Sequence, residues 1–260
     1  MRQCYRPVRF RSFDKIRAFI ERVPSDIKLG LVSPVATDYP SFDFLVDFLL
    51  DESREVSFGS LRVEGISDRL LTLLKVSGQR TVTLAPETAN ETLRRSIGKD
   101  FSNDLFEEKI SMIYNRGFRK LRLYFMIGLP GETPGDVERI GLMIRSLRKK
   151  FRGLEIIATI SPFVPKPFTP FEKEKILPVS EISRRLKVIK RISGAGIKSD
   201  GAKKAWLEAL ISQGDEKIGL GICKLGKEVF SLKAWDSFLG LEGYLRRRQK
   251  EAPWRKVIEN

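Results

Sequence analysis

The sequence has no histidine among its 260 residues, and its two cysteines, Cys4 and Cys223, lie far apart. The absence of histidine excludes Ser-His-Asp and Cys-His catalysis, and it excludes histidine-ligated metal sites. Two distant cysteines indicate neither a disulfide framework nor a zinc ribbon. Chemistry carried out by these residues alone would therefore rest on carboxylates, lysine, tyrosine or a bound cofactor.

Long apolar runs are also absent. No run reaches the roughly 18 residues that a membrane-spanning helix requires. The first residues, MRQCYRPVRFRS, are basic and lack the apolar stretch of a signal peptide. We therefore expect a soluble, cytoplasmic protein with no membrane partner.

Acidic residues are outnumbered by basic ones. The chain has 48 Lys and Arg against 33 Asp and Glu, which gives a formal net charge of +15. Such a charge attracts polyanions, including RNA. It is equally typical of a solvated surface rich in Lys and Arg, and both interpretations stay open.

The length and the 42% of hydrophobic residues suit one large α/β domain, alone or with a small appendage.

Amphipathic helices alternate with short apolar strands along most of the chain. We expect strands over residues 28–33, 56–63, 81–87, 121–130 and 154–163. Helices are expected from Ser12, Phe42, Asp68 and Thr133, and over residues 91–97, 105–115 and 180–192. The helix from Thr133 has the strongest start signal, since Thr133 and Asp136 form a capping-box pattern with Pro134 between them.

This alternation predicts an α/β fold in which right-handed crossovers place the strands parallel. Periodicity alone leaves an open doubly wound sheet and a barrel as alternatives. The strand pattern stops at about Asp200, and helices are expected over residues 203–212, 218–225 and 234–247. We therefore predict an α/β domain over residues 1–198 and a helical C-terminal extension over residues 199–260.

Polar and glycine residues mark the carboxyl ends of the expected strands, where parallel α/β proteins gather their working groups. The markers are Ser33, Thr37 and Asp38 after the first strand, Arg62 and Glu64 at the second, Glu87, Thr88 and Asn90 at the third, Gly128 to Glu132 after the fourth, and Ser161 to Glu172 after the fifth. Together they predict a polar, partly apolar-walled site for a charged organic ligand.

Each marker also has a structural interpretation. Glu87 would cap the following helix, and Arg62 would pair with Glu64 or Asp68 at the surface. Gly128 to Glu132 would form only a tight turn, and no Walker sequence follows it. The Pro- and Phe-rich segment over residues 161–172 would be a rigid lid or a packed loop.

Several blocks of the sequence resemble the cobalamin-associated radical S-adenosylmethionine (radical SAM) proteins. They are YRPVRFRS over residues 5–12, the segment over residues 60–88, LRLYFMIGLPGET over residues 121–133 and SPFVPKPFTPFE over residues 161–172. The segment over residues 201–219 and the ending APWRKV over residues 252–257 are similar to one uncharacterised subfamily. The blocks occur in order along nearly the whole chain.

The resemblance implies a partial parallel (β/α)6 barrel that lacks its first strand. Family members hold three irons of a 4Fe–4S cluster on a CxxxCxxC loop, S-adenosylmethionine chelates the fourth iron, and its cleavage yields a 5′-deoxyadenosyl radical. This sequence has no CxxxCxxC, and Cys4 is too close to Tyr5 to be the third cluster cysteine. We therefore expect an N-terminally truncated chain, although an upstream separate chain or a relic would give the same pattern.

Ligand roles follow from the resemblance, residue by residue. Ser33 and Asp38 would meet the methionine end of S-adenosylmethionine, and Arg62 would pair with its carboxylate. Glu87 would accept hydrogen bonds from the ribose hydroxyls. The adenine would lie between Ile127 and Gly128 on one side and Phe163 and Val164 on the other.

Two functions follow. The first is a radical SAM enzyme core, with an unknown substrate and with cobalamin bound by a separate or missing domain. We expect this core to be inactive as an isolated chain, because the cluster would form only in a longer form that carries CxxxCxxC. The alternative is a cluster-free module that binds RNA or a partner chain, and an upstream radical SAM or cobalamin-binding segment is one such partner.

Overall fold

A curved sheet of parallel strands forms the centre of the protein. The computed structural model describes residues 9–33, 35–59, 61–194, 196–251 and 254. Strands β1 (Leu29–Leu31) and β2 (Val56–Phe58) pair with each other, and β3 (Thr81–Glu87), β4 (Lys120–Ile127), β5 (Glu155–Pro162) and β6 (Ile197–Ser199) pair in that order. A single parallel bridge between Leu61 and Leu84 joins the two groups. The α/β class and the parallel pairing are confirmed.

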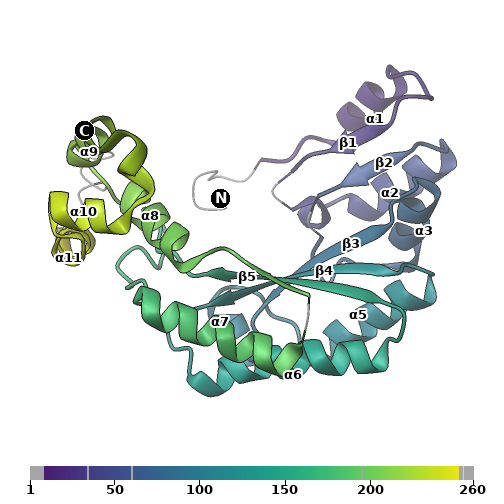
Figure 1. The fold of residues 1–260 in the computed structure, drawn as a ribbon. Helices are drawn as coiled ribbons and strands as arrows, with labels where there is room; N and C mark the ends of the chain where they lie inside the picture. The colour runs from purple at the N-terminus through teal and green to yellow at the C-terminus, as the bar shows by residue number, and fades with distance from the viewer. Residues whose placement is uncertain (1–8, 34, 60, 195, 252–253, 255–260) are drawn as a thin grey trace.

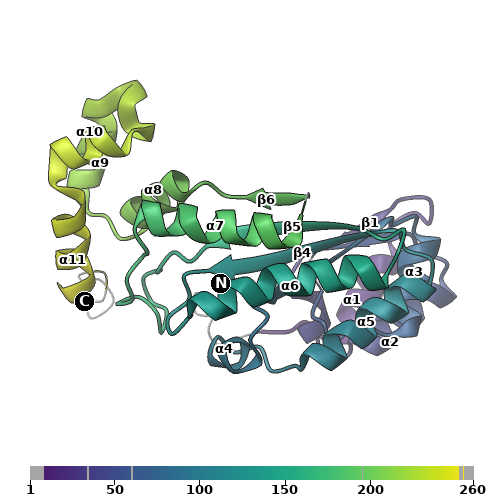
Figure 2. The same ribbon diagram turned by 60° about the horizontal axis from the view of Figure 1, so that its bottom comes forward.

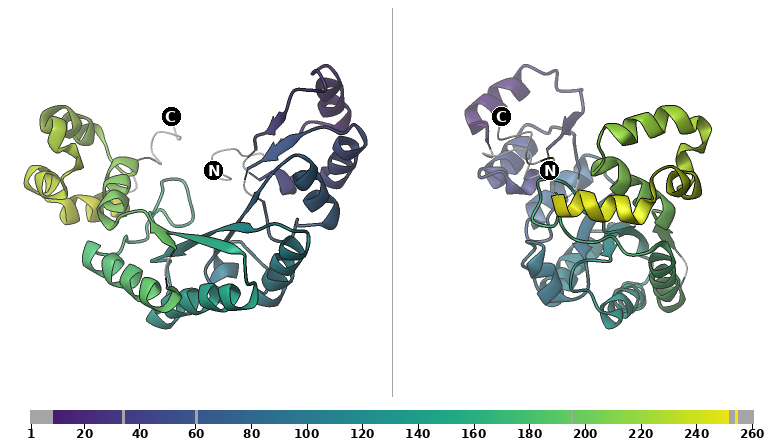
Figure 3. Two further views of the ribbon diagram at one scale, coloured as in Figure 1. Left: turned by 45° about the vertical axis from the view of Figure 1, so that its right-hand side comes forward. Right: turned by 90° about the vertical axis from the view of Figure 1, so that its left-hand side faces the viewer.

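The strands follow an arc that does not close on itself within the described residues (Figure 1). Helices α2 (Phe42–Asp51), α3 (Asp68–Val76), α5 (Asn103–Asn115), α6 (Pro134–Lys150) and α7 (Val179–Ser193) lie around its convex side, as the left view of Figure 3 shows. Helix α1 (Phe13–Glu21) packs on α2, where the ring of Phe13 meets that of Phe48 edge-on, and α4 (Glu91–Ser96) follows the carboxyl end of β3. The architecture is a partial barrel.

The core lies between the sheet and these outer helices, and strict alternation along the strands creates it. Leu121, Leu123, Phe125 and Ile127 of β4 are at most 1% exposed, while the residues between them are partly or fully exposed. The strands β3 and β5 alternate in the same way. Because successive side chains of a strand point to opposite faces, one face of the sheet is buried against helices and the other is open.

Local sequence signals set the helix starts. The side chain of Thr133 accepts a hydrogen bond from the amide of Asp136, and the carboxylate of Asp136 accepts one from the amide of Thr133, with Pro134 in the first turn. The predicted capping box is confirmed. Ser67, Asn90 and Ser102 cap α3, α4 and α5 in the simpler way, each accepting from an amide three residues on.

One strand was missed and two expectations about elements were wrong. The strand β6, which pairs with β5, has only three residues and was not predicted from the sequence. The second strand ends at Phe58 and not at residue 63. The last expected helix is two helices, α10 (Leu232–Leu239) and α11 (Leu241–Glu251), because Gly240 adopts a left-handed conformation with φ +63° that ends α10.

The helices α8 (Ala202–Ser212), α9 (Glu216–Leu225), α10 and α11 gather beyond the carboxyl ends of the strands (Figure 2). They have their own small core around Trp235, which is fully buried. They also hold the loop after β5: Trp206 donates a hydrogen bond to the carbonyl of Leu177, and Gln213 donates to the carbonyls of Pro165 and Glu172. Within the described residues, no helix is both long and apolar enough to cross a bilayer.

Candidate functional site

All described strands point the same way, so the residues that follow them lie along one rim, which we call the carboxyl edge. Arg62 follows Leu61, the residue bridged to Leu84 of β3. Glu87 ends β3 and lies in register with Phe125 of β4, and Gly128 follows the last residue of β4. The structure therefore places Arg62, Glu87 and Gly128 at the ends of three neighbouring segments of one rim.

Arg62 and Asp38 form an ion pair at this edge. The Arg62 Nη2 donates to the Asp38 Oδ2 over 3.1 Å, and the Nε lies 2.5 Å from the Oδ1. The hydroxyl of Thr37 also accepts a hydrogen bond from the Arg62 amide over 3.2 Å. Both charged side chains are about 30% exposed, so the pair is open to a ligand. Surface pairing of Arg62 with Glu64 or Asp68 was therefore wrong.

Gly65 brings the two segments close enough for this pairing. A Cβ at Gly65 would lie 2.6 Å from the Cβ of Thr37, which is closer than two non-bonded carbon atoms can approach. The loop with Thr37 and Asp38 therefore packs on the segment with Arg62 only because residue 65 has no side chain.

Glu87 has a strained backbone, with φ +62° in a residue that is not glycine. Its Oε1 accepts a hydrogen bond from the Lys99 Nζ over 2.7 Å, and the same amine donates to the carbonyl of Ala85 over 2.7 Å. The register of β3 against β4 shifts between Leu84 and Glu87, so the regular alternation ends there. Glu87 does not cap a helix, because Asn90 is the cap of α4.

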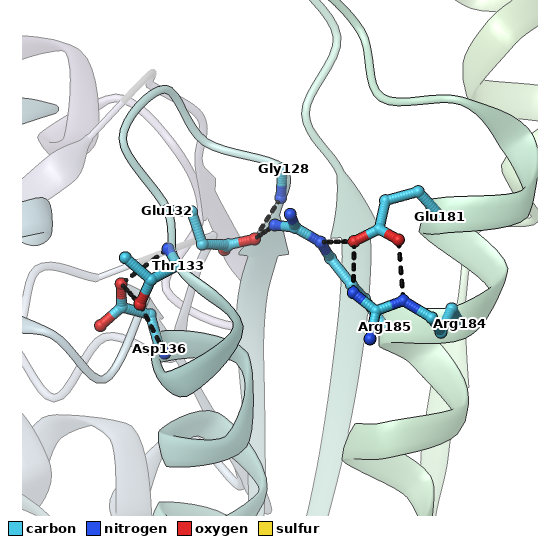
Figure 4. A network of polar contacts seen from close by, with 7 residues as sticks. All are labelled: Gly128, Glu132, Thr133, Asp136, Glu181, Arg184 and Arg185. Atoms are coloured by element: carbon cyan, nitrogen blue, oxygen red, sulfur yellow. Dashed lines mark hydrogen bonds and ion pairs between the residues drawn. The ribbon is translucent and has the colours of Figure 1, made fainter.

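Gly128 is fixed by a buried carboxylate. It has φ +83°, and its amide donates to the Glu132 Oε2 over 2.7 Å (Figure 4). The same oxygen is paired with Arg185 of α7, and Arg185 also donates to Glu181 over 2.8 Å. The turn from Gly128 to Glu132 is therefore tied to α7, which is more than a tight turn into α6 requires.

Burial and pairing shift the pKa values of this network in opposite directions. Burial raises the pKa of Glu132, whose side chain is fully covered, against the lowering effects of the Gly128 amide and Arg185. Hydrogen bonds from Arg184 and Arg185 lower the pKa of the more exposed Glu181 to about 2. Burial acts to raise the pKa of Asp136, but hydrogen bonds from Thr133 and Asn90 bring it below its usual value.

The other residues expected to contact the cofactor are placed less favourably for that role. Ser33 is exposed and makes no polar contact among the described residues. Ile127 is fully buried against the outer helices, so its side chain does not reach the open face. Phe163 is 7% exposed within a small apolar cluster with Leu93 and Leu129, and Val164 is half-buried against the main core. The loop after β5 is a packed loop, held by the C-terminal helices.

Sequence reasoning missed the open face of the sheet, which we call the concave face. Its residues are Thr83 and Ala85 of β3, Arg122, Tyr124 and Met126 of β4, Ile157, Thr159 and Ser161 of β5, and Lys198 of β6. The signal was present as a period of two, since Thr83, Arg122, Tyr124, Thr159 and Ser161 alternate with buried apolar residues. The strands seemed continuously apolar because Met126, Ile157 and Ala85 also lie on this face.

The described residues contain no group of three His, Cys, Asp or Glu side chains that could hold a metal ion. Cys223 is exposed and free, whereas Cys4 lies outside the described residues. A shallow surface hollow lined by Leu225, Ser231 and Phe238 belongs to the C-terminal helices and not to the carboxyl edge.

Comparison with known proteins identifies the family. The chain is 30% identical, over 265 aligned residues, to an uncharacterised protein of Methanocaldococcus jannaschii, and the match covers 99% of this chain but 58% of that protein. An N-terminally deleted Elp3 of Methanocaldococcus infernus is 16% identical, with a TM-score of 0.46 over 72% of this chain and 51% of that one. HydG, a maturase of the FeFe-hydrogenase, is 12% identical, with a TM-score of 0.46 over 86% of this chain and 71% of that one.

The family model of the radical SAM superfamily matches residues 3–144, which is more than half of the chain and includes β1 to β4 with most of α6. The chain belongs to the radical SAM superfamily.

Proposed function

We propose that this chain forms the S-adenosylmethionine-binding core of a radical SAM enzyme, with residues 1–198 as the partial barrel and residues 199–260 as an extension that holds the loop after β5. The observation that carries the proposal is the partly exposed Arg62–Asp38 pair at the carboxyl edge, which also carries Glu87 and Gly128. Membership of the superfamily supports it.

The Arg62–Asp38 pair suits the methionine end of S-adenosylmethionine. That end is a zwitterion, so a guanidinium and a carboxylate held 2.5 Å apart offer one partner to its carboxylate and one to its ammonium. Exchange of the internal pair for these two contacts keeps both charges neutralised.

Glu87 and Gly128 suit the other end of the cofactor. The Glu87 Oε1 is bound to Lys99, while its Oε2 has no partner among the described residues and is free to accept from ribose hydroxyls. At Gly128 the position of a Cβ is packed by Leu177 and Phe163, so the adenine would lie against the carbonyl side of this turn and not in the place of the missing side chain. Once bound, S-adenosylmethionine supplies an adenosyl radical, and the role of this chain is to orient it.

The residues present do not fit an iron–sulfur cluster. Such clusters need several thiolates, whereas this sequence has two distant cysteines and no CxxxCxxC. The match covers 58% of the length of the curated relative. We therefore propose that the cluster ligands, and any cobalamin-binding domain, come from residues outside this sequence. The cobalamin-coupled form of the chemistry rests on the resemblance of the sequence blocks alone.

Binding of S-adenosylmethionine to the purified chain, measured by calorimetry without iron, tests the proposal. We expect Arg62→Gln and Glu87→Gln each to weaken binding about tenfold or more, the effect of about 1.4 kcal/mol for a lost charge-assisted contact. Matched controls are Arg69→Gln and Glu107→Gln, which break the ion pairs Arg69–Asp47 and Glu107–Lys150 on the outer helices.

A wild-type chain that does not bind S-adenosylmethionine, or control variants that lose as much affinity as the site variants, would refute the proposal. The alternative, a cluster-free module that binds RNA or a partner protein, rests on the net charge of +15. The same titration separates the two functions, because such a module has no site for S-adenosylmethionine.

A further inference from the structure

The concave face carries two cations without a partner. Arg122 and Lys198 are exposed, and neither makes a hydrogen bond or an ion pair among the described residues. Other charges on or beside this face are already neutralised: Lys120 is paired with Glu155, and Arg62 with Asp38. The concave face therefore has an excess of positive charge between β4 and β6.

Hydroxyl groups lie between these two cations. Tyr124 is in register with Thr159, and Thr159 is in register with Lys198, so the three side chains form one row on the same face. Arg122 lies on the same face of β4 as Tyr124, two residues closer to the amino end of the strand. Lys198 is two strands away from β4, which corresponds to roughly 10 Å between backbones and is within the reach of two long side chains.

Polar groups also lie between this row and the carboxyl edge. The Ser161 hydroxyl donates a hydrogen bond to the Asp200 Oδ2 over 2.8 Å, and the Asp200 Oδ1 lies 3.3 Å from the Lys204 Nζ. Both carboxylate oxygens of Asp200 thus already have partners, Ser161 and Lys204. The row lies close to the carboxyl edge, because Tyr124 belongs to β4 and Gly128 directly follows the end of that strand.

We propose that Arg122, Tyr124, Thr159 and Lys198 bind the anionic group of the substrate, a phosphate or a carboxylate on a small molecule. The guanidinium of Arg122 can donate to two oxygens of such a group, and the ammonium of Lys198 can donate to another oxygen. The hydroxyls of Tyr124 and Thr159 are further donors. Two cations within roughly 10 Å match one small anion, whereas RNA engages several phosphates spread along its backbone. As a statement about the substrate, the inference rests on the proposed function; the anion site itself is independent of it.

Calorimetric titration of the chain with inorganic pyrophosphate and with citrate, without S-adenosylmethionine or iron, tests this site. We expect saturable binding of at least one anion, and the better ligand identifies phosphate or carboxylate as the group. Arg122→Gln and Lys198→Gln should each weaken binding about tenfold, and the double variant should abolish it. Arg122→Lys, which keeps the charge but loses the fork, should fall between wild type and Arg122→Gln.

The matched control is the double variant Arg145→Gln/Lys187→Gln, which removes the same two charges from exposed positions on α6 and α7. It should bind like wild type. An equal loss of affinity in the control variant, or no saturable binding of either anion by wild type, would overturn the inference. Binding of RNA by a wild-type chain that binds neither small anion would also overturn it. All the substituted side chains are exposed, so unfolding of a variant is not expected, and circular dichroism checks it. Anion binding in a chain that fails to bind S-adenosylmethionine would refute the proposed function and leave the anion site standing.

Discussion

At the residue scale, the carboxyl edge depends on a few side chains whose contacts cross from one element to another. Glu132 is the most constrained of them, because it is fully buried and holds both the Gly128 amide and Arg185. Its Oε1 is buried and has no hydrogen bond among the described residues. A buried carboxylate of this kind is stable only while its cation stays in place.

We therefore predict that Arg185→Met destabilises the protein by about 3 kcal/mol near neutral pH, as expected for a buried pair that loses one partner. Burial already raises the pKa of Glu132, and loss of Arg185 raises it further. An acid with a raised pKa in the folded state loses stability as the pH rises from its unfolded pKa towards its folded pKa. The difference from wild type should thus be smaller at pH 5 than at pH 8 in urea unfolding.

Arg184→Met is the control for this substitution. Arg184 shares Glu181 with Arg185 but is 56% exposed, so its loss should change the stability much less than Arg185→Met does, at either pH. An equal effect of the two substitutions, or a larger effect of Arg185→Met at pH 5, would contradict the role given to Glu132.

At the element scale, the loop after β1 and the segment after β2 form one half of the candidate site. The short helix η1 (Ala36–Asp38) carries Asp38, and Gly65 permits its close contact with the segment that carries Arg62. The geometry of the ion pair is therefore a property of two loops packed together, and a methyl group between them should disturb it.

We predict that Gly65→Ala weakens binding of S-adenosylmethionine several-fold and destabilises the protein by about 1–3 kcal/mol, the usual cost of overpacking. The new Cβ would lie 2.6 Å from Thr37 and would push the loop away from Arg62. Gly59→Ala is the control, because a Cβ at Gly59 meets no atom within 4 Å. Calorimetry and thermal unfolding of both variants give the measurement, and a Gly65→Ala variant that binds like wild type would exclude this contact from the site.

At the scale of the whole molecule, the strands form an open arc, and α8 to α11 lie beyond their carboxyl ends (Figures 1 and 2). The ion pairs Arg62–Asp38 and Lys99–Glu87 lie at this carboxyl edge, next to the concave face. Under the proposed function, this arrangement would give S-adenosylmethionine and the substrate adjacent places. It offers no set of thiolates, since the sequence has two cysteines.

We accordingly predict that anaerobic reconstitution of this chain with iron and sulfide leaves no stable 4Fe–4S cluster, because too few thiolate ligands are present. Iron and sulfide analysis after desalting is the measurement, together with the absorbance near 410 nm. About four irons per chain, retained with that absorbance, would show that residues of this chain hold a cluster after all.

The sequence by itself determined the α/β class, the parallel strands and most helix starts, because these depend on local periodicity and on caps such as Thr133 with Asp136. It also placed Arg62, Glu87 and Gly128 at one edge, since parallel strands end on the same side. Only the tertiary structure decided that Arg62 pairs with Asp38, that Ile127 faces the core, and that Arg122 and Lys198 share the concave face. Those outcomes depend on strand register and on contacts between residues far apart in the chain, such as Gly65 against Thr37, which local patterns do not encode.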